Sequence, residues 1–235
     1  MDLLPRAAST DETVRLARAA VLPIGSFEQH GGHLPLTTDT LVACVVAEAL
    51  VHANELLLLP PITISCSHEH RGFPGTVSIR ATTLIAIIED IRESLRVSGI
   101  DKLVLVNGHG GNYVLSNVAL QANLQGRHVL VFPTSDDWRV AREHAGMVTT
   151  NHEDMHAGEL ETSLLLHAVP DAVRPGFREA DHAAADRPLF LMSGTAAYSE
   201  TGVIGRPSAA TPEKGKAVID CLTTVFSERL ESLLA

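Results

Sequence analysis

Apolar residues fall into two alternating patterns along this chain. Short continuous apolar runs, which are typical of strands buried on both faces, occur at 21–25, 55–60, 101–106 and 128–133. Helices are predicted between and after them, with apolar residues three to four positions apart in the first two, over 39–53, 80–97, 111–125, 159–169 and 212–234. Strands that alternate with helices predict an α/β fold, a three-layer α/β/α sandwich around a mostly parallel sheet.

No feature of the sequence divides the chain into parts. It has 235 residues without an internal repeat or a clear boundary, so we expect a single domain over residues 1–235. The stretch 174–205 is rich in turn residues and poorly periodic. We expect long loops there, forming either a lid or an oligomer contact.

Composition and charge narrow the classes of partner. Hydrophobic residues make up 45% of the chain and charged residues 20%, which is enough apolar surface for a sizeable core. The net charge of −10 repels phosphate groups, so we expect no nucleic-acid partner and no membrane partner. No apolar run reaches the roughly 18 residues of a membrane span, and residues 1–10 lack the pattern of a signal peptide. The widely spaced Cys44, Cys66 and Cys221 indicate reduced thiols in a cytoplasmic protein.

Polar clusters follow the ends of the predicted strands, where parallel sheets bind their ligands. The first contains Glu28 and His30, which lie two residues apart and point to one side of an extended segment. Asp39 stands at the start of the next helix, where a carboxylate is favoured. A carboxylate, an imidazole and a second carboxylate form an ordinary divalent-metal site. The alternative is a polar strand end in which Asp39 only caps its helix.

Two further clusters each carry a histidine. His109 lies in the glycine-rich turn 107–112, where the glycines let the backbone approach a ligand closely. His156 and Glu159 are three residues apart and share a face if the segment is helical, whereas Glu161 points away and would sit behind the ligands. Taken alone, each cluster fits a structural role as well as a functional one: a glycine turn around His109, and a helix start with capping charges around His156 and Glu159.

Together the clusters predict a metal centre, with the ligands Glu28, His30, Asp39, His109 and Glu159. The three carboxylates contribute −3 against the +4 of two divalent ions, and a bridging hydroxide would balance the remainder, so two ions are favoured over one. His156, beside such a centre, is the expected catalytic residue and would carry protons to a leaving nitrogen.

Three more residues are candidates for substrate binding. His33 would face the substrate or stand behind the ligands. His70 precedes a Phe-Pro-Gly turn and would line the pocket rim, from the same or a neighbouring subunit, unless its loop is simply solvated. Trp138 is the only tryptophan, and would form either a substrate platform or part of a core or interface.

These motifs resemble the creatininase (creatinine amidohydrolase) family. The similarity runs in order from about residue 20 to 215 and is carried by the stretches 25–39 (GSFEQHGGHLPLTTD), 69–76 (EHRGFPGT), 107–112 (NGHGGN), 156–163 (HAGELETS) and 202–211 (GVIGRPSAAT). The resemblance implies a doubly wound α/β fold, a dinuclear site that often holds zinc or manganese, and a homohexamer. It places metal ligands at Glu28, His30, the bridging Asp39 and His109, and proton transfer at His156.

One position departs from the family pattern. Creatininase proper has a glutamate two residues after the histidine of the NGH motif, and this chain has Gly111 there. Glu159 is the natural substitute ligand, so the chain resembles the wider family more than true creatininase. That wider family includes formamidopyrimidine-type deformylases and the mycofactocin-pathway peptidase. The FPGT and GVIG stretches resemble the peptidase.

We therefore expect a metal-dependent amidohydrolase that cleaves a C–N bond of a cyclic or linear amide, other than a peptide bond, through a hydroxide bridging two divalent metals. Zinc is the first expectation, with manganese or iron as alternatives. The expected partners are a small-molecule amide and further copies of the chain in a hexamer. The alternative functions are a peptidase acting on a short precursor peptide, and a non-catalytic protein that binds a metal or a ligand.

Overall fold

A four-stranded parallel sheet forms the frame of the computed structural model, which describes residues 4–235. The first three residues of the predicted domain therefore lie outside the described residues. The strands follow the order β2-β1-β3-β4 and comprise β1 (Ala20–Ile24), β2 (Leu57–Leu58), β3 (Leu103–Asn107) and β4 (Val129–Phe132). The central pair is in register from Ala20 opposite Leu103 to Ile24 opposite Asn107, so β1 and β3 end side by side.

Helices account for most of the remaining regular structure. The α-helices are α1 (Ser9–Arg15), α2 (Thr38–Asn54), α3 (Ala81–Val97), α4 (Val114–Ala122), α5 (Ser135–His144), α6 (Glu159–Ala168), α7 (Phe190–Ser193) and α8 (Pro212–Leu234). Short 3₁₀ turns are η1 (His68–His70), η2 (Asn123–Gln125), η3 (Pro170–Ala172), η4 (Phe177–Glu179), η5 (Thr195–Ala197) and η6 (Pro207–Ala209). Within residues 4–235, no helix is both long enough and apolar enough to cross a membrane.

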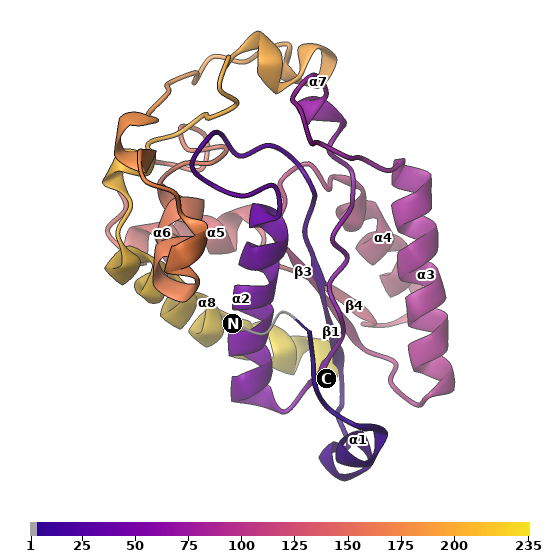
Figure 1. The fold of residues 1–235 in the computed structure, drawn as a ribbon. Coiled ribbons are helices and arrows are strands. Elements are labelled where there is room, and N and C mark those ends of the chain that lie inside the picture. The colour runs from indigo at the N-terminus through magenta and orange to yellow at the C-terminus, as the bar shows by residue number, and fades with distance from the viewer. Residues whose placement is uncertain (1–3) are drawn as a thin grey trace.

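Helices cover both faces of the sheet. Figure 1 shows α2, α5, α6 and α8 on one side of the strands, and α3 and α4 on the other. Successive strand residues supply the two cores, because side chains along a strand alternate between faces. Val21 and Val104 pack with α2, α6 and α8, whereas Leu22 and Leu105 pack with α3 and α4. The predicted three-layer α/β/α architecture with a parallel sheet is therefore confirmed.

The second strand is shorter than the apolar run predicts. Of the stretch 55–60, only two residues form β2. The amide of Leu59 still donates to the carbonyl of Val21, but Pro60 and Pro61 have no N–H group with which to continue the ladder. The prolines therefore end the strand within the predicted run.

Periodicity does not reveal the polar helix α5. Its start is fixed by reciprocal capping, in which Thr134 Oγ1 accepts the N–H of Asp137 and the Asp137 carboxylate accepts the N–H of Thr134. Threonine followed three residues later by an acid was thus the usable signal in the sequence. The stretch 174–205 forms loops interrupted by 3₁₀ turns and the four-residue α7, close to the prediction.

Candidate metal centre

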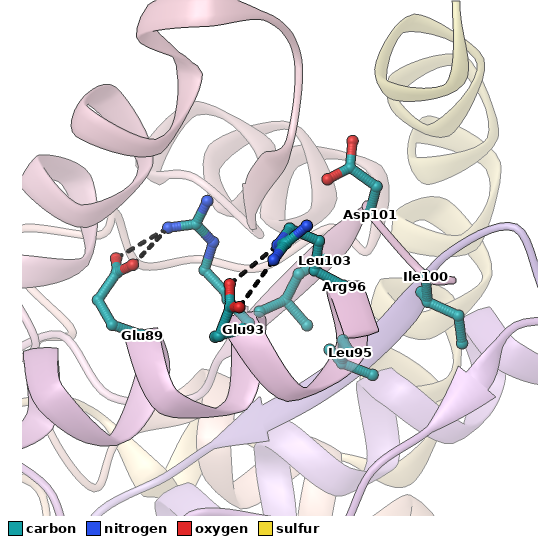
Figure 2. Close-up of a pocket in the computed structure, with 8 residues that line it drawn as sticks. Glu89, Glu93, Leu95, Arg96, Ile100, Asp101 and Leu103 are labelled. Carbon is teal, nitrogen blue, oxygen red and sulfur yellow. Dashed lines mark hydrogen bonds and ion pairs between the residues drawn. The ribbon is translucent and has the colours of Figure 1, made fainter. Parts of the chain in front are cut away.

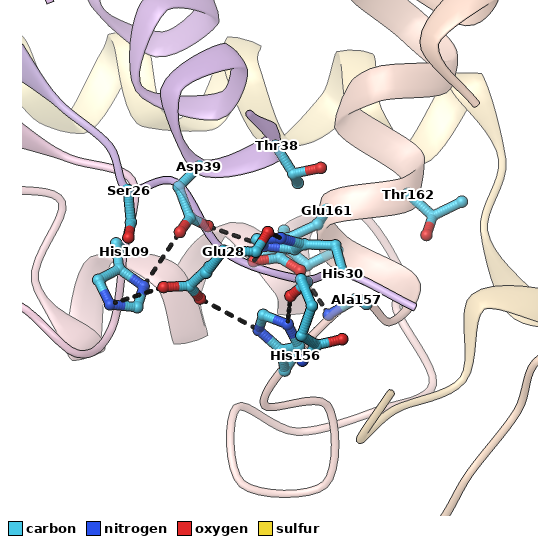
Figure 3. Close-up of polar contacts among 12 residues, drawn as sticks. Ser26, Glu28, His30, Thr38, Asp39, His109, His156, Ala157, Glu161 and Thr162 are labelled. Carbon is cyan, nitrogen blue, oxygen red and sulfur yellow. Dashed lines mark hydrogen bonds and ion pairs between the residues drawn. The ribbon is translucent and has the colours of Figure 1, made fainter. Parts of the chain in front are cut away.

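Six buried or nearly buried ionisable side chains meet beyond the carboxyl ends of β1 and β3 (Figure 3). They are Glu28, His30, Asp39, His109, His156 and Glu161. The strand ends and helix starts explain their convergence. Residues 28–30 follow β1, residue 109 follows β3, and residues 39 and 161 lie in the first turns of α2 and α6. Parallel strands thus direct separate loops to one edge of the sheet.

The first potential metal-binding group contains Glu28, Asp39 and His109, whose ligand atoms all lie within 4.8 Å of one another. His109 Nε2 donates to the carbonyl of Cys66 at 2.8 Å, so Nδ1 is the nitrogen that could bind a metal in place of a proton. That Nδ1 lies 3.1 Å from Asp39 Oδ2. Glu28 Oε2 lies 3.3 Å from the same imidazole, at Nε2.

The second group contains His30, Asp39 and Glu161, again within 4.8 Å. His30 Nδ1 donates to the carbonyl of Glu28 at 3.1 Å, which leaves Nε2 facing the carboxylates. His30 Nε2 lies 3.0 Å from Asp39 Oδ1 and 3.9 Å from Glu161 Oε1. Asp39 therefore offers one oxygen to each group, the arrangement of a carboxylate that bridges two sites.

Unpaired buried oxygens make this cluster suitable for a cation. Both oxygens of Glu28 and Oδ2 of Asp39 are buried without a hydrogen-bond partner. Burying a polar atom without a partner costs free energy, and buried carboxylates are normally paired or bound to a metal. Carboxylate oxygens beside neutral imidazole nitrogens are the donors that zinc, manganese and iron accept. The residues present thus fit a divalent ion.

The pKa values show how the metal-free cluster balances its charge with protons. Burial raises the pKa of Glu28 to about 8, although His109 opposes that shift. Burial lowers the pKa of His30, but Asp39 outweighs it and brings the value to about 9. Glu28 and Asp39 likewise hold the pKa of His109 well above its usual value against the effect of burial. Without a metal, protons on these groups therefore balance the negative charge that a bound cation would otherwise balance.

His156 is positioned as a neutral imidazole within the cluster. Its ring lies between those of His30 and His70, with both centroid separations at 4.2 Å. Its Nε2 donates to the carbonyl of Gln29 at 2.6 Å, so Nδ1 carries the lone pair and lies 3.7 Å from Glu28 Oε1. Burial, reinforced by His30 and His70, holds the pKa of His156 well below its usual value.

The structure does not bring Glu159 into the cluster, and this prediction needs correction. The Glu159 carboxylate is buried elsewhere, where it accepts hydrogen bonds from the amide and hydroxyl of Thr149 and pairs with Lys214 Nζ at 2.5 Å. Of the two acids in the first turn of α6, it is Glu161 whose carboxylate faces His30.

The error comes from where the helix begins. The predicted shared face of residues 156 and 159 requires helical backbone at both, but α6 begins at Glu159 and His156 pairs in extended form with Ile204. Between them, Ala157 has a left-handed φ of 55°, and its N–H donates to Glu161 Oε2 at 2.6 Å. This turn directs Glu161, and not Glu159, towards the cluster.

Asp154 fixes the start of α6 and thereby the position of Glu161. Asp154 Oδ1 accepts the N–H of Glu159 at 2.6 Å, and Oδ2 accepts the N–H of Leu160 at 3.0 Å. Oδ2 also pairs with Arg142 at 2.9 Å, with both side chains nearly buried. The helix start is thus capped by a carboxylate that is itself anchored to α5.

The three predicted substrate residues lie in different places. Trp138 lines an open cavity of about 440 Å³ whose wall also includes His109 and Glu161. His70 lines an adjoining cavity of about 150 Å³ and lies 3.1 Å from Glu28 Oε1. His33 borders neither cavity: it is buried and donates to the carbonyl of Ala157, so it supports the turn before α6.

Two residues near the cluster were not singled out from the sequence. Gln29 donates to His70 Nδ1 at 2.9 Å, which leaves the other ring nitrogen of His70 facing Glu28. Glu69 Oε1 lies 3.3 Å from His109 Nε2. The sequence indicated a pocket rim or a solvated loop at His70, and no local pattern showed that η1 packs against the cluster.

Comparisons with known proteins show similarity to one family and to its fold. A profile of the creatininase family, described as creatinine amidohydrolase, matches residues 7–230. A mycofactocin precursor peptide peptidase from Mycobacterium ulcerans (strain Agy99) is 35% identical over 223 residues, covering 87% of this chain and 83% of its own. The creatinine amidohydrolase of Pseudomonas putida is 27% identical over 221 residues, covering 85% of this chain and 84% of its own. A solved structure titled "Creatininase Mn" superposes with a TM-score of 0.81 at 25% identity, covering 97% of this chain and 96% of its own.

Proposed function

The chain belongs to the creatininase family of amidohydrolases, and from this premise we propose that it hydrolyses a C–N amide bond at a centre of two divalent ions. The observation that carries the proposal is the pair of overlapping donor groups that share Asp39. The unpaired buried oxygens of Glu28 and Asp39 support it, because such atoms are stabilised by a cation.

Each donor group would hold one ion. Glu28, Asp39 and His109 would form one site, and His30, Asp39 and Glu161 the other, with Glu161 in the role first expected for Glu159. When bound, such ions lower the pKa of water and polarise the carbonyl of the scissile amide. Zinc suits this mixture of imidazole and carboxylate donors best, and manganese or iron remain alternatives.

His156 would move the proton that hydrolysis requires. Its Nε2–H is held by the Gln29 carbonyl, so the free Nδ1 faces the cluster and is the atom that accepts a proton. Because the pKa of His156 is lowered, the imidazole is neutral before reaction and readily passes the proton on to the leaving nitrogen. A non-catalytic protein has no need of a proton carrier, but His156 also forms a possible ligand group with Glu28 and His30. His156→Ala therefore separates the two functions when its metal content equals that of the wild type.

The larger cavity is suited to a small amide. Its wall combines Trp138, Tyr113 and Met155 with the polar side chains of Asn107 and Asn151. A flat or compact amide could therefore stack on aromatic surface and still make directional hydrogen bonds. The hexameric assembly and the cytoplasmic location stay predictions, which light scattering and cell fractionation would test.

A second candidate function is cleavage of a short peptide. The two adjoining cavities share His109, Tyr113, Met155 and Glu161, so a bound chain could extend to both sides of the cluster. The mycofactocin precursor peptide peptidase from Mycobacterium ulcerans is 35% identical, which favours the same candidate.

The test is metal analysis followed by a substrate panel. We expect about two divalent ions per chain by mass spectrometry, no hydrolysis after chelation, and recovery on adding zinc or manganese. The panel should contain creatinine, formamides, other small amides and short peptides. Cleavage of peptides alone would select the second candidate. Retention of both ions without turnover of any class, in wild type and His156→Ala alike, would favour a binding protein.

A further inference from the structure

The side chain of Glu69 occupies the place that a side chain at position 111 would fill. A Cβ atom built on Gly111 would lie 1.7 Å from Glu69 Oε1 and 2.8 Å from Glu69 Cδ. Gly111 is not among the glycines with a left-handed φ, so its backbone conformation does not exclude a side chain. The glycine is required instead by the carboxylate and the imidazole of His109 that lie against it, since the same Cβ would lie 2.3 Å from His109 Nε2.

Glu69 reaches this place from a distant segment. It lies in η1, and Gly194 packs against its backbone so closely that a Cβ there would lie 2.6 Å from the Glu69 carbonyl oxygen. Its neighbour His70 turns to Glu28, while the Glu69 side chain, 13% exposed, turns to His109. Thus η1 presents two consecutive side chains to two different residues of the cluster.

The contact with His109 is directional. His109 Nε2–H points at the carbonyl of Cys66 at 2.8 Å, and Glu69 Oε1 lies 3.3 Å from the same nitrogen. The opposite nitrogen, Nδ1, is the one beside Asp39. A carboxylate next to the N–H of a ligating histidine fixes the ring and makes the other nitrogen a stronger donor.

We propose that Glu69 is a positioning residue for His109, held against the imidazole from η1. The inference rests on the proposed metal-dependent function. The absence of a side chain at Gly111 makes the contact possible, since a Cβ there would meet both Glu69 Oε1 and His109 Nε2. Glu69 also lines the smaller cavity, where it completes the wall beside His109 and Gly111.

The test compares Glu69→Ala and Glu69→Gln with the wild type. The readouts are zinc affinity, by competition with a chromophoric chelator, and the visible spectrum of the cobalt-loaded protein. We expect Glu69→Ala to weaken zinc binding about 10- to 100-fold and to shift the cobalt bands. Glu69→Gln should lose less, because its amide keeps a polar group beside His109 Nε2 without the charge.

Two controls separate this role from general damage. Glu89→Ala removes a partly exposed carboxylate on α3 that pairs with Arg92, and should leave zinc affinity unchanged. Thermal unfolding of each chelated protein reports whether the fold itself is weakened. Zinc affinity and cobalt bands in Glu69→Ala equal to those of the wild type would overturn the role of Glu69 alone. A wild type that binds no divalent ion would overturn the proposed function as well.

Discussion

Two regions of the molecule are rich in charged side chains but differ in how these side chains are buried and paired. On α3, Glu89 pairs with Arg92 at 2.7 Å and Glu93 with Arg96 at 2.8 Å, beside a shallow cavity of about 90 Å³ (Figure 2). Every acid in these pairs has an arginine three residues along the helix, and all four side chains are partly or largely exposed. In the cluster of Figure 3, carboxylates are buried and face histidines, and three oxygens have no hydrogen-bond partner.

Burial decides what each region does with its charge. Arg96 lowers the pKa of Glu93 at the surface, whereas burial raises the pKa of Glu28 to about 8. Exposed pairs of this kind contribute little to stability, because water and salt screen them. The buried cluster is costly unless a cation completes it. Acidic residues alone therefore do not mark the candidate site; it is distinguished by carboxylate oxygens that lack a hydrogen-bond partner and are grouped with histidines.

Removing the carboxylate that both donor groups share should have the largest effect on metal content and activity. Asp39→Asn takes away the charge that both donor groups use, so we expect loss of both ions and a fall in activity of more than about 100-fold, beyond the effect of removing an outer partner. Metal analysis of the purified variant and turnover on the best amide substrate measure this. Retention of two ions would show that Asp39 does not bridge the sites.

The neighbouring acids of α6 provide a matched pair of variants. Glu161→Gln should release one ion and leave the fold intact, since this side chain faces His30. Glu159→Gln should keep both ions but reduce the free energy of unfolding by about 1–3 kcal/mol, because it weakens the bonds to Lys214 and Thr149. Metal analysis and chemical denaturation distinguish them, and the reverse pattern would restore Glu159 as the ligand.

Protons and metal ions should compete for the buried carboxylates of the cluster. In the metal-free protein the pKa of Glu28 is raised to about 8 and that of Glu161 to about 7, chiefly by burial. Both carboxyls hold protons below these values, so metal affinity should rise between pH 6 and 9, with protons released on binding. Calorimetric titration in buffers of different ionisation enthalpy measures that release. An affinity independent of pH would contradict the shifts.

The stability of the metal-free protein should follow the opposite sign. The folded-state pKa of His30 is about 9, above its ordinary value of 6.5, because Asp39 outweighs burial. A raised pKa means that the folded state binds the proton more tightly, so this stabilisation is present below pH 6.5 and is lost as pH rises to about 9. Urea unfolding of chelated and loaded protein across this range should show the loss in the chelated form only.

The smallest effect is expected on α3. Glu89→Gln breaks a pair that is 23–40% exposed, so the free energy of unfolding should change by no more than about 0.5 kcal/mol and metal content should not change. Chemical denaturation measures the first and mass spectrometry the second. A large loss of either would mean that this surface is coupled to the buried cluster.

The sequence was sufficient where the chemistry follows the chain order. Parallel strands and their loops brought Glu28, His30, Asp39 and His109 to one edge, because the ends of neighbouring strands must meet there. The alternation of strands and helices correctly predicted the three-layer fold, and the resemblance of the motifs correctly predicted the family. The choice between Glu159 and Glu161 was not, since it depends on where α6 begins, and helix boundaries are set by caps such as Asp154.

The sequence pattern did not predict contacts that depend on tertiary packing alone. Nothing near Glu69 indicates that its carboxylate would lie against Gly111, because the approach depends on how η1 is placed over the turn after β3. Similarly, Gln29 reads as an ordinary polar residue until His70 is found beside it. Such pairs are distant in sequence and follow no periodicity that could be read beforehand.

The position of the cluster also determines when in folding a metal can act. Its side chains come from segments between Glu28 and Glu161, and they converge only after β1 pairs with β3, where Ala20 lies opposite Leu103. Pairing over such a sequence distance is a late and slow event in folding. A metal therefore cannot nucleate this fold as it does in a zinc finger. The newly made chain would first reach its native topology with protons on His30 and His109, and a bound ion would then slow unfolding of a structure that already exists.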